Sequence, residues 1–361
     1  MWTDTRLTRH LGLRLPIVQG PFGGGLSTAA LAAAVSNAGG LGSFGAHFLS
    51  PPQIGELVAE LRRLTPHPFA LNLWVPQPGE PSTIAPAELE RHVARLRPIL
   101  RQLDLPDPGL PSAFTPRFEE QVEAAIDARP QVLSFVMGVP PAHVIDAAKA
   151  RGIALLGTAT TVDEAIALDQ AGVDVIVASG SDAGGHRGAF LRPVRESLVG
   201  TLSLVPQVVD AVRAPVVAAG GVADGRGVAA ALALGADGVQ IGTAFLACDE
   251  SGASAGHRRA LASPRARTTV LTRVFSGRTA RGLVNEFVEA MTPHEADVPE
   301  YPVQNWLTQP IRRAAAAAER DDHLSLWAGQ SAALARPRPA AELVAALVEQ
   351  TEQVILGLMK R

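Results

Sequence analysis

Short apolar segments recur through the first two-thirds of this chain of 361 residues, and stretches rich in Ala, Leu and Glu separate most of them. Most of these segments are apolar throughout rather than alternating, which is typical of parallel strands buried on both faces. We predict eight strands, at Pro16–Gly20, Leu41–Gly45, Phe69–Leu73, Val132–Val136, Ile153–Gly157, Val173–Ala178, Pro215–Ala219 and Gly238–Gly242. The stretches between them predict helices, for example Ser27–Asn37, Pro52–Leu64 and Val162–Gln170.

The junction from helix to strand follows a weak repeat. Three predicted helices end at Gly152, Gly172 and Gly235, which we expect to be left-handed because glycine has no Cβ to clash. Alternating strands and helices favour a parallel sheet, which could be open and doubly wound or closed. Because eight strands is the number that closes a barrel, we predict an α/β fold, a (β/α)8 TIM barrel with a helical insertion and a C-terminal helical extension.

Two segments fall outside this repeat. We assign residues 1–75 and 131–248 to the barrel, and residues 76–130 and 249–361 to segments that cap the active site. A long excursion between two strands is usually a lid or a functional insertion. Within these segments we predict helices near Pro86–Leu103, Pro116–Ala128, Ile311–Glu319 and Ala340–Leu358.

Composition excludes several classes of protein. Hydrophobic residues make up 47% of the chain and charged residues 19%, so a large core can form. The formal net charge of −3 gives no electrostatic signature of nucleic-acid binding. The single cysteine, Cys248, excludes a disulfide framework, and no group at metal-ligand spacing predicts a metal. No signal pattern or membrane span is evident, so we expect a cytoplasmic protein without a membrane partner; the oligomeric state is left open, a homodimer included.

A barrel carries its chemistry on the loops that follow its strands. The first loop contains Gly23–Gly25, whose backbone could press against a flat ring or a phosphate, and Ser27 is a candidate helix cap. Asn72, at the end of the third strand, could hydrogen-bond a loop or offer its amide to a ligand. The literal G-x-G-x-x-G match at Gly40–Gly45 is rejected as a dinucleotide site because it follows a helix and contains its own strand.

The loop after the sixth strand carries the strongest catalytic candidate. His186 is flanked by glycines in Ser179–Gly188, and imidazole titrates near neutrality, so it can act as a general base. The alternative is a glycine-rich turn with an exposed His-Arg pair. For Arg187 itself we expect a solvated side chain rather than one that steers an anion. We favour the catalytic interpretation of His186. The loops after the seventh and eighth strands, with Gly220–Gly221 and Gly242–Thr243, predict a phosphate site.

Taken together, PIVQGPF, SNAGGLGSFGA, FALNLWVP, SDAGGHRG, APVVAAGGVADGRG and VQIGTAFLAC resemble the nitronate monooxygenases, formerly called 2-nitropropane dioxygenases. The resemblance implies an FMN-dependent barrel that converts alkyl nitronates, and in some members neutral nitroalkanes, with O2 to a carbonyl compound and nitrite. It implies that His186 is the catalytic base. The flavin contacts that it implies, joined to the predicted phosphate site, are Gln19, Gly20, Pro21, Phe22, Asn72, Ser179, Gly180, Gly184, Gly220, Gly221, Gln240, Ile241, Gly242 and Thr243.

The chain departs from the family pattern at some positions. Gly20-Pro21-Phe22 stands where Ala-Pro-Met is frequent, Ser179 replaces a frequent glutamine, and Tyr301 is the single tyrosine. Two other functions remain open: a flavin reductase that passes hydride from a nicotinamide to a quinone or an enoyl thioester, and a non-catalytic sensor of a phosphate ligand. The pair His186-Arg187 favours the oxygenase over the reductase, and the retained histidine argues against the sensor.

Overall fold

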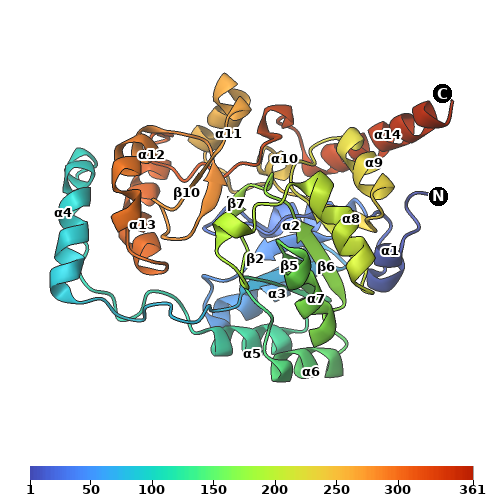
Figure 1. The fold of residues 1–361 in the computed structure, drawn as a ribbon, viewed down its shortest axis with the longest axis horizontal. Coiled ribbons are helices and arrows are strands. Elements are labelled where there is room, and N and C mark those ends of the chain that lie inside the picture. The colour runs from blue at the N-terminus through green and yellow to red at the C-terminus, as the bar shows by residue number, and fades with distance from the viewer. Residues whose placement is uncertain (361) are drawn as a thin grey trace.

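The computed structural model describes residues 1–360 and shows a closed parallel barrel (Figure 1). Its strands follow the spatial order β1-β9-β8-β6-β5-β4-β3-β2, and a parallel bridge between Val18 and Leu41 joins the two ends of that order. The strands are β1 Ile17–Gln19, β2 Gly42–Gly45, β3 Phe69–Trp74, β4 Val132–Val136, β5 Ala154–Ala159, β6 Val175–Ser179, β8 Val216–Ala219 and β9 Gly238–Ile241. All eight predicted strands, and the TIM barrel, are confirmed.

Both faces of the strands are buried, which explains their continuous apolar sequence. Val18, Val175 and Val217 point into the barrel interior, where they form one cluster with Leu7 of helix α1 (Arg6–Leu11). That helix closes the end of the barrel at which the strands begin. The opposite faces of the strands pack against the surrounding helices in a second, larger cluster.

Eight helices form the ring around the barrel. They are α2 Ala29–Asn37, α3 Pro51–Leu64, α5 Phe118–Ala128, α6 Ala142–Ala150, α7 Val162–Ala171, α8 Thr201–Ala211, α9 Gly225–Ala233 and α14 Ala340–Met359. Helix α5 packs against α3 and β3, and α14 packs against α9 and α2. Each of the two segments that we assigned to the cap supplies one helix of this ring. Val122 of α5 and Leu347 of α14 are buried in the barrel cluster, so the apolar faces of these helices require that position.

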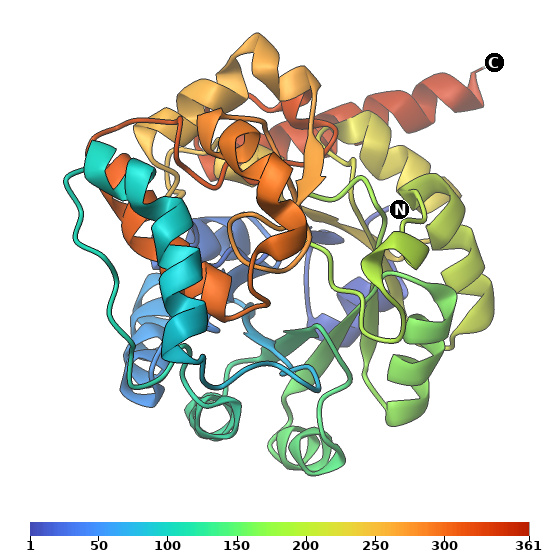
Figure 2. The same cartoon turned by 60° about the vertical axis from the view of Figure 1, so that its left-hand side comes forward.

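The remaining elements lie over the end of the barrel at which the strands finish (Figures 1 and 2). They are α4 Pro86–Gln102, α10 Thr243–Leu246, α11 Ala255–Ala262, α12 Glu286–Met291, α13 Val303–Ala317, and short 3-10 turns at Val194–Glu196, Pro264–Arg267, Thr292–Asp297 and Ala332–Leu334. A small antiparallel sheet joins β7 (Gly185–His186), β11 (Ala280–Gly282) and β10 (Val270–Thr272). Helix α4 packs beside α13 in a separate apolar cluster that includes Val93 and Leu307.

Glycines behave as the sequence predicts at the helix ends. Gly152, Gly172 and Gly235 have φ of 69°, 88° and 92°, which confirms the left-handed conformation. Within Gly40–Gly45, a Cβ on Gly42 would collide with the backbone of Ala32. The glycine there permits close packing of α2 on β2. No helix within residues 1–360 is long and apolar enough to cross a membrane.

Candidate active site

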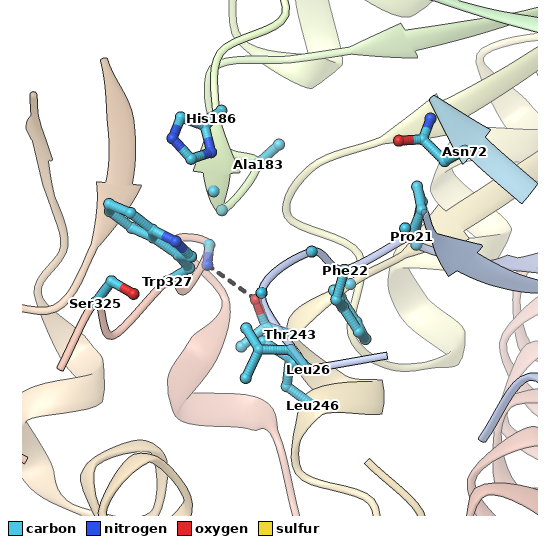
Figure 3. Close-up of a pocket in the computed structure, with 18 of the residues that line it drawn as sticks. Pro21, Phe22, Leu26, Asn72, Ala183, His186, Thr243, Leu246, Ser325 and Trp327 are labelled. Carbon is cyan, nitrogen blue, oxygen red and sulfur yellow. Dashed lines mark hydrogen bonds between the residues drawn. The ribbon is translucent and has the colours of Figure 1, made fainter. Parts of the chain in front are cut away.

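A cavity of about 670 Å³ lies at the carboxyl ends of the strands. We call it the main cavity, and its size falls within the roughly 300–1,000 Å³ of typical pockets for small molecules. The predicted site residues that line it are Gly20, Pro21, Phe22, Asn72, Ser179, Gly184, His186, Gly220, Gly221, Gln240, Gly242 and Thr243. Figure 3 shows His186 and Trp327 on one side of the main cavity, with Asn72, Pro21 and Phe22 facing them from the other.

Three predicted flavin contacts lie outside the lining of the main cavity. Gln19 is fully buried; its amide oxygen accepts a hydrogen bond from the Ser43 N–H at 2.8 Å, and its amide nitrogen donates to the carbonyl of Gly20. Gly180 packs against Thr201, and Ile241 is fully buried within β9. Through these two hydrogen bonds, the buried side chain of Gln19 orders the first loop.

The first loop is held by a serine that we considered as a helix cap. The Ser27 hydroxyl accepts hydrogen bonds from the N–H groups of Phe22 at 3.0 Å and Gly45 at 3.4 Å. The cap of α2 is the neighbouring Thr28, which accepts from the Leu31 N–H, so the cap was predicted one residue too early. Because Ser27 ties the loop to β2, the glycines after Phe22 face the main cavity in a fixed conformation.

The loops after β8 and β9 form a cradle of backbone. Gly220 and Gly221 have φ of 106° and 75°, and Gly242 directly precedes the short helix α10. A Cβ on Gly242 would have the Phe22 ring as its nearest neighbour, at 3.7 Å, so it would project into the main cavity. The segment 329–331 crosses these loops, where the Gly329 N–H donates to the Thr243 hydroxyl at 2.9 Å (Figure 3). Exposed backbone N–H groups beside a helix start fit a phosphate.

His186 lies in β7, which pairs with β11, so the C-terminal segment positions its ring. Its Nε2 is 2.8 Å from the hydroxyl of Ser276, and that hydroxyl donates to the carbonyl of Arg278 at 3.0 Å. A hydroxyl has one proton to donate, so Ser276 must accept from His186. This network assigns the proton to Nε2 and leaves the Nδ1 lone pair free to act as a base.

The environment keeps this imidazole uncharged at neutral pH. Burial lowers the pKa of His186 well below 6.5, and the charges of Arg278 and Arg312 and the ring of His47 lower it further. A neutral imidazole can accept a proton from a substrate, whereas an imidazolium cannot.

An aromatic wall surrounds His186. Trp74 and Trp327 meet its ring edge-on, with centroids 4.9 Å and 5.3 Å away, and the ring of His47 stacks on Trp74 at 4.1 Å. Burial lowers the pKa of His47 to about 3, so it is also neutral. Our sequence interpretation missed these three residues, although Trp74 directly follows the third predicted strand, where such a residue is expected.

One face of α13 gives the main cavity a positive character. Asn305, Gln309, Arg312 and Arg313 line it at helical spacing, and no Asp or Glu occurs among its lining residues within 1–360. Arg312 donates to the Asn305 side chain at 2.8 Å and pairs with no carboxylate of residues 1–360. Burial lowers the pKa of Arg312 to about 10, which leaves it charged at neutral pH. Such a surface favours an anion.

Arg187 differs from our expectation. The solvated arginine that we predicted is wrong, because Arg187 is only 2% exposed. Its guanidinium donates to the carbonyls of Gly180 at 2.6 Å and Ser179 at 2.8 Å. Because His186 pairs with Ala280, the side chain of the next residue, Arg187, points beneath the loop and stabilises its backbone.

Away from the main cavity, ligand atoms of Glu286, Asp322 and His323 lie within 4.8 Å of one another. Both carboxylate oxygens of Asp322 already accept hydrogen bonds from Arg320. That pairing competes directly with a cation, so we assign no metal to this group.

The sequence and the fold of the whole chain can be compared with those of known proteins. A model of the nitronate monooxygenase family matches residues 4–350. A protein of Staphylococcus aureus (strain Newman) named probable nitronate monooxygenase is 42% identical over 356 residues, covering 98% of this chain and 99% of that protein. The crystal structure of a nitroalkane oxidase from Streptomyces ansochromogenes is 39% identical, covers 98% of this chain and 99% of its own, and gives a TM-score of 0.87. FabK from Thermotoga maritima is 28% identical, covers 99% of each chain, and gives a TM-score of 0.78.

Proposed function

Because the chain belongs to the nitronate monooxygenase family, we propose that it catalyses the FMN-dependent oxidation of alkyl nitronates by O2 to a carbonyl compound and nitrite. Enzymes of this family are oxidoreductases that use a flavin. The observation that carries the proposal is a histidine, His186, in a cavity whose lining residues within 1–360 include two arginines and no Asp or Glu. Deprotonation next to a nitro group creates an anion, and this cavity suits that anion.

The residues present fit FMN. The cradle at Gly221, Gly242 and Thr243 would hold its phosphate, and the glycines of the first loop would lie against its ring. Asn72 donates from its amide nitrogen to Ser134 at 2.9 Å, which leaves its amide oxygen available to a ring N–H. When bound, FMN supplies the electron acceptor and the reaction with O2. We also propose that α4, α13 and the small sheet cap the main cavity and exclude water from it.

The histidine performs the proton transfer for neutral nitroalkanes. The Nδ1 lone pair of His186 takes the proton from the carbon that bears the nitro group, and the electron pair of that C–H bond moves onto the nitro oxygens. The imidazolium that forms keeps its Nε2 proton on Ser276. The charges of Arg312 and Arg313 stabilise the anionic nitronate. A preformed nitronate enters without this step, so it does not need the base.

Anaerobic spectra test the proposal directly. Ethyl nitronate added to the flavin-loaded protein should bleach the flavin absorbance, because the substrate itself is the reductant. NADH added to a separate sample should leave the spectrum unchanged. Bleaching by NADH alone would instead make the protein a nicotinamide-dependent reductase. A spectrum that neither compound changes would support a non-catalytic flavin-binding protein.

The Gly242→Val substitution should deplete the purified protein of FMN. A side chain there projects into the cradle, as its 3.7 Å approach to Phe22 indicates, and would occupy the space of the phosphate. We expect at least about a tenfold loss of FMN affinity, since several charge-assisted hydrogen bonds would be lost. Flavin content per protein measures the effect. Gly109→Val, at a glycine with open space around it, is the control. Equal flavin content in both variants would show that the phosphate binds elsewhere.

Ser276→Ala should slow the turnover of neutral nitroalkanes by about tenfold, within the range of one hydrogen bond. Without the hydroxyl, His186 loses the acceptor that holds its proton on Nε2, and the basic nitrogen no longer faces the substrate in every molecule. Nitronate turnover should change by less than about twofold, because that substrate is already deprotonated. An equal decrease in the turnover of both substrates would show that Ser276 has only a structural role.

A further inference from the structure

A second cavity, of about 450 Å³, adjoins the main cavity. It lies between the barrel and two stretches of the insertion, 75–82 and 112–118. The stacked rings of His47 and Trp74 line both cavities, so this pair is the partition between them. Neither the predicted site residues nor the proposed reaction accounts for the second cavity.

Arg278 is the central charge of the second cavity. Its side chain is 11% exposed and pairs with Glu80 of the insertion. The guanidinium lies over the ring of Tyr301 at 4.5 Å and near that of Trp74 at 5.6 Å. A guanidinium has five N–H donors, and the pair with Glu80 is the one side-chain hydrogen bond of Arg278 within residues 1–360. The other donors therefore remain available to a ligand.

Apart from Glu80, no residue that lines the second cavity within 1–360 can neutralise the charge of Arg278. Glu80 is the single carboxylate among the lining residues within 1–360, and its Oε1 also accepts from the Gln77 N–H at 2.8 Å. Arg117 lies at the rim and is exposed. The charge of Arg278 also acts across the partition, since it contributes, after burial, to the lowered pKa of both His47 and His186.

We propose that the second cavity is a binding site for a planar anion with two oxygens, in which the guanidinium of Arg278 holds the oxygens and the anion competes with Glu80 for that guanidinium. This inference rests on the proposed function only for the identity of the anion, which is the substrate nitronate before it reaches His186 or the product nitrite after it leaves. Arg suits such a group because its fork of N–H donors matches two oxygens side by side. The aromatic rings of Trp74 and Tyr301 lie against the guanidinium of Arg278 and hold it in place.

The first test is direct binding of nitrite to the flavin-loaded protein. The Nε–H signal of Arg278, assigned in a ¹⁵N-arginine NMR spectrum by its absence in Arg278→Lys, should shift with nitrite. Glu80→Gln should tighten the nitrite Kd by about threefold or more, because the competing carboxylate is removed. Arg195→Gln, at an exposed arginine that lines neither cavity, should leave the Kd unchanged. An Arg278 signal that stays fixed at saturating nitrite would overturn the site.

The second test identifies the physiological anion. If nitronate occupies the site before reaction, Arg278→Gln should raise KM for ethyl nitronate by about tenfold with kcat nearly unchanged, and Arg278→Lys should recover part of this loss. KM for neutral nitroethane should not change. If nitrite occupies the site, Arg278→Gln should instead weaken product inhibition by nitrite and leave both KM values unchanged. Equal losses on every substrate would reduce Arg278 to a structural residue.

The two proposals can fail separately. A protein that does not oxidise nitronates but whose Arg278 signal responds to nitrite retains the anion site and loses the proposed function. A fully active protein whose Arg278 signal does not respond, and whose KM and nitrite inhibition do not depend on Arg278, retains the function and loses the site.

Discussion

The His186→Asn substitution should reduce kcat/KM for neutral nitroalkanes by about 10²–10⁴-fold, the usual contribution of a positioned general base. Asparagine can keep a hydrogen bond to Ser276, whose hydroxyl lies 2.8 Å from the histidine, but it cannot accept the proton of a carbon acid. Turnover of preformed nitronates should decrease far less. Steady-state oxygen consumption with nitroethane and with ethyl nitronate measures both effects on one preparation.

Flavin content is the control for this experiment. His186 lies across the main cavity from Pro21 and Asn72, so the variant should retain its FMN (Figure 3). Equal activity of the variant and the parent protein on both substrates would remove His186 from the mechanism. An equal loss on both substrates would assign it to substrate binding.

The protein should lose stability steeply below pH 6.5, because buried histidines, among them His47, His186 and His257, stay neutral in the folded state. Burial lowers the pKa of His257 to about 4 and that of His47 to about 3. In the unfolded chain each titrates near 6.5, so the unfolded state binds more protons between these values and 6.5. His47 and His257 should therefore decrease the unfolding free energy by about 3 kcal/mol per pH unit from pH 6.5 to 4, at about 1.4 kcal/mol for each, and the lowered pKa of His186 acts in the same direction.

Urea unfolding at several pH values measures this slope. His257→Gln should reduce the slope by one proton, since glutamine can donate to the Trp327 carbonyl as Nε2 of the histidine does but does not titrate. His47→Gln should have the same effect on the slope. A slope that neither substitution changes would show that these imidazoles are already charged in the folded protein.

The barrel could be predicted from sequence because its signals are local. A strand buried on both faces is apolar throughout, as in Val132–Val136, which has the same bounds in the structure as in the prediction. A left-handed helix end needs glycine, and Gly172 marks it. The loops that follow the strands then bring His186, Asn72 and the glycine pairs to one end, because parallel strands all finish there.

The rest of the candidate site depends on packing between distant segments. Trp327 and Arg312 reach the main cavity from the C-terminal segment, and no local spacing connects them with His186. The burial of Arg187 could not be predicted for the same reason, because its sequence neighbours indicate only a solvated turn. Its side chain is buried because β7 pairs with β11, which lies about 90 residues further along the chain.

Helix α14 completes the ring between α9 and α2, yet it follows both of them in the chain by more than 100 residues. During translation, the apolar faces that α14 will cover on those two helices therefore stay open until α14 itself has been made. The strand that carries His186 likewise has no partner until β11 has been made. Until these later segments join the barrel, the uncovered apolar faces are exposed to association with other chains and to chaperones.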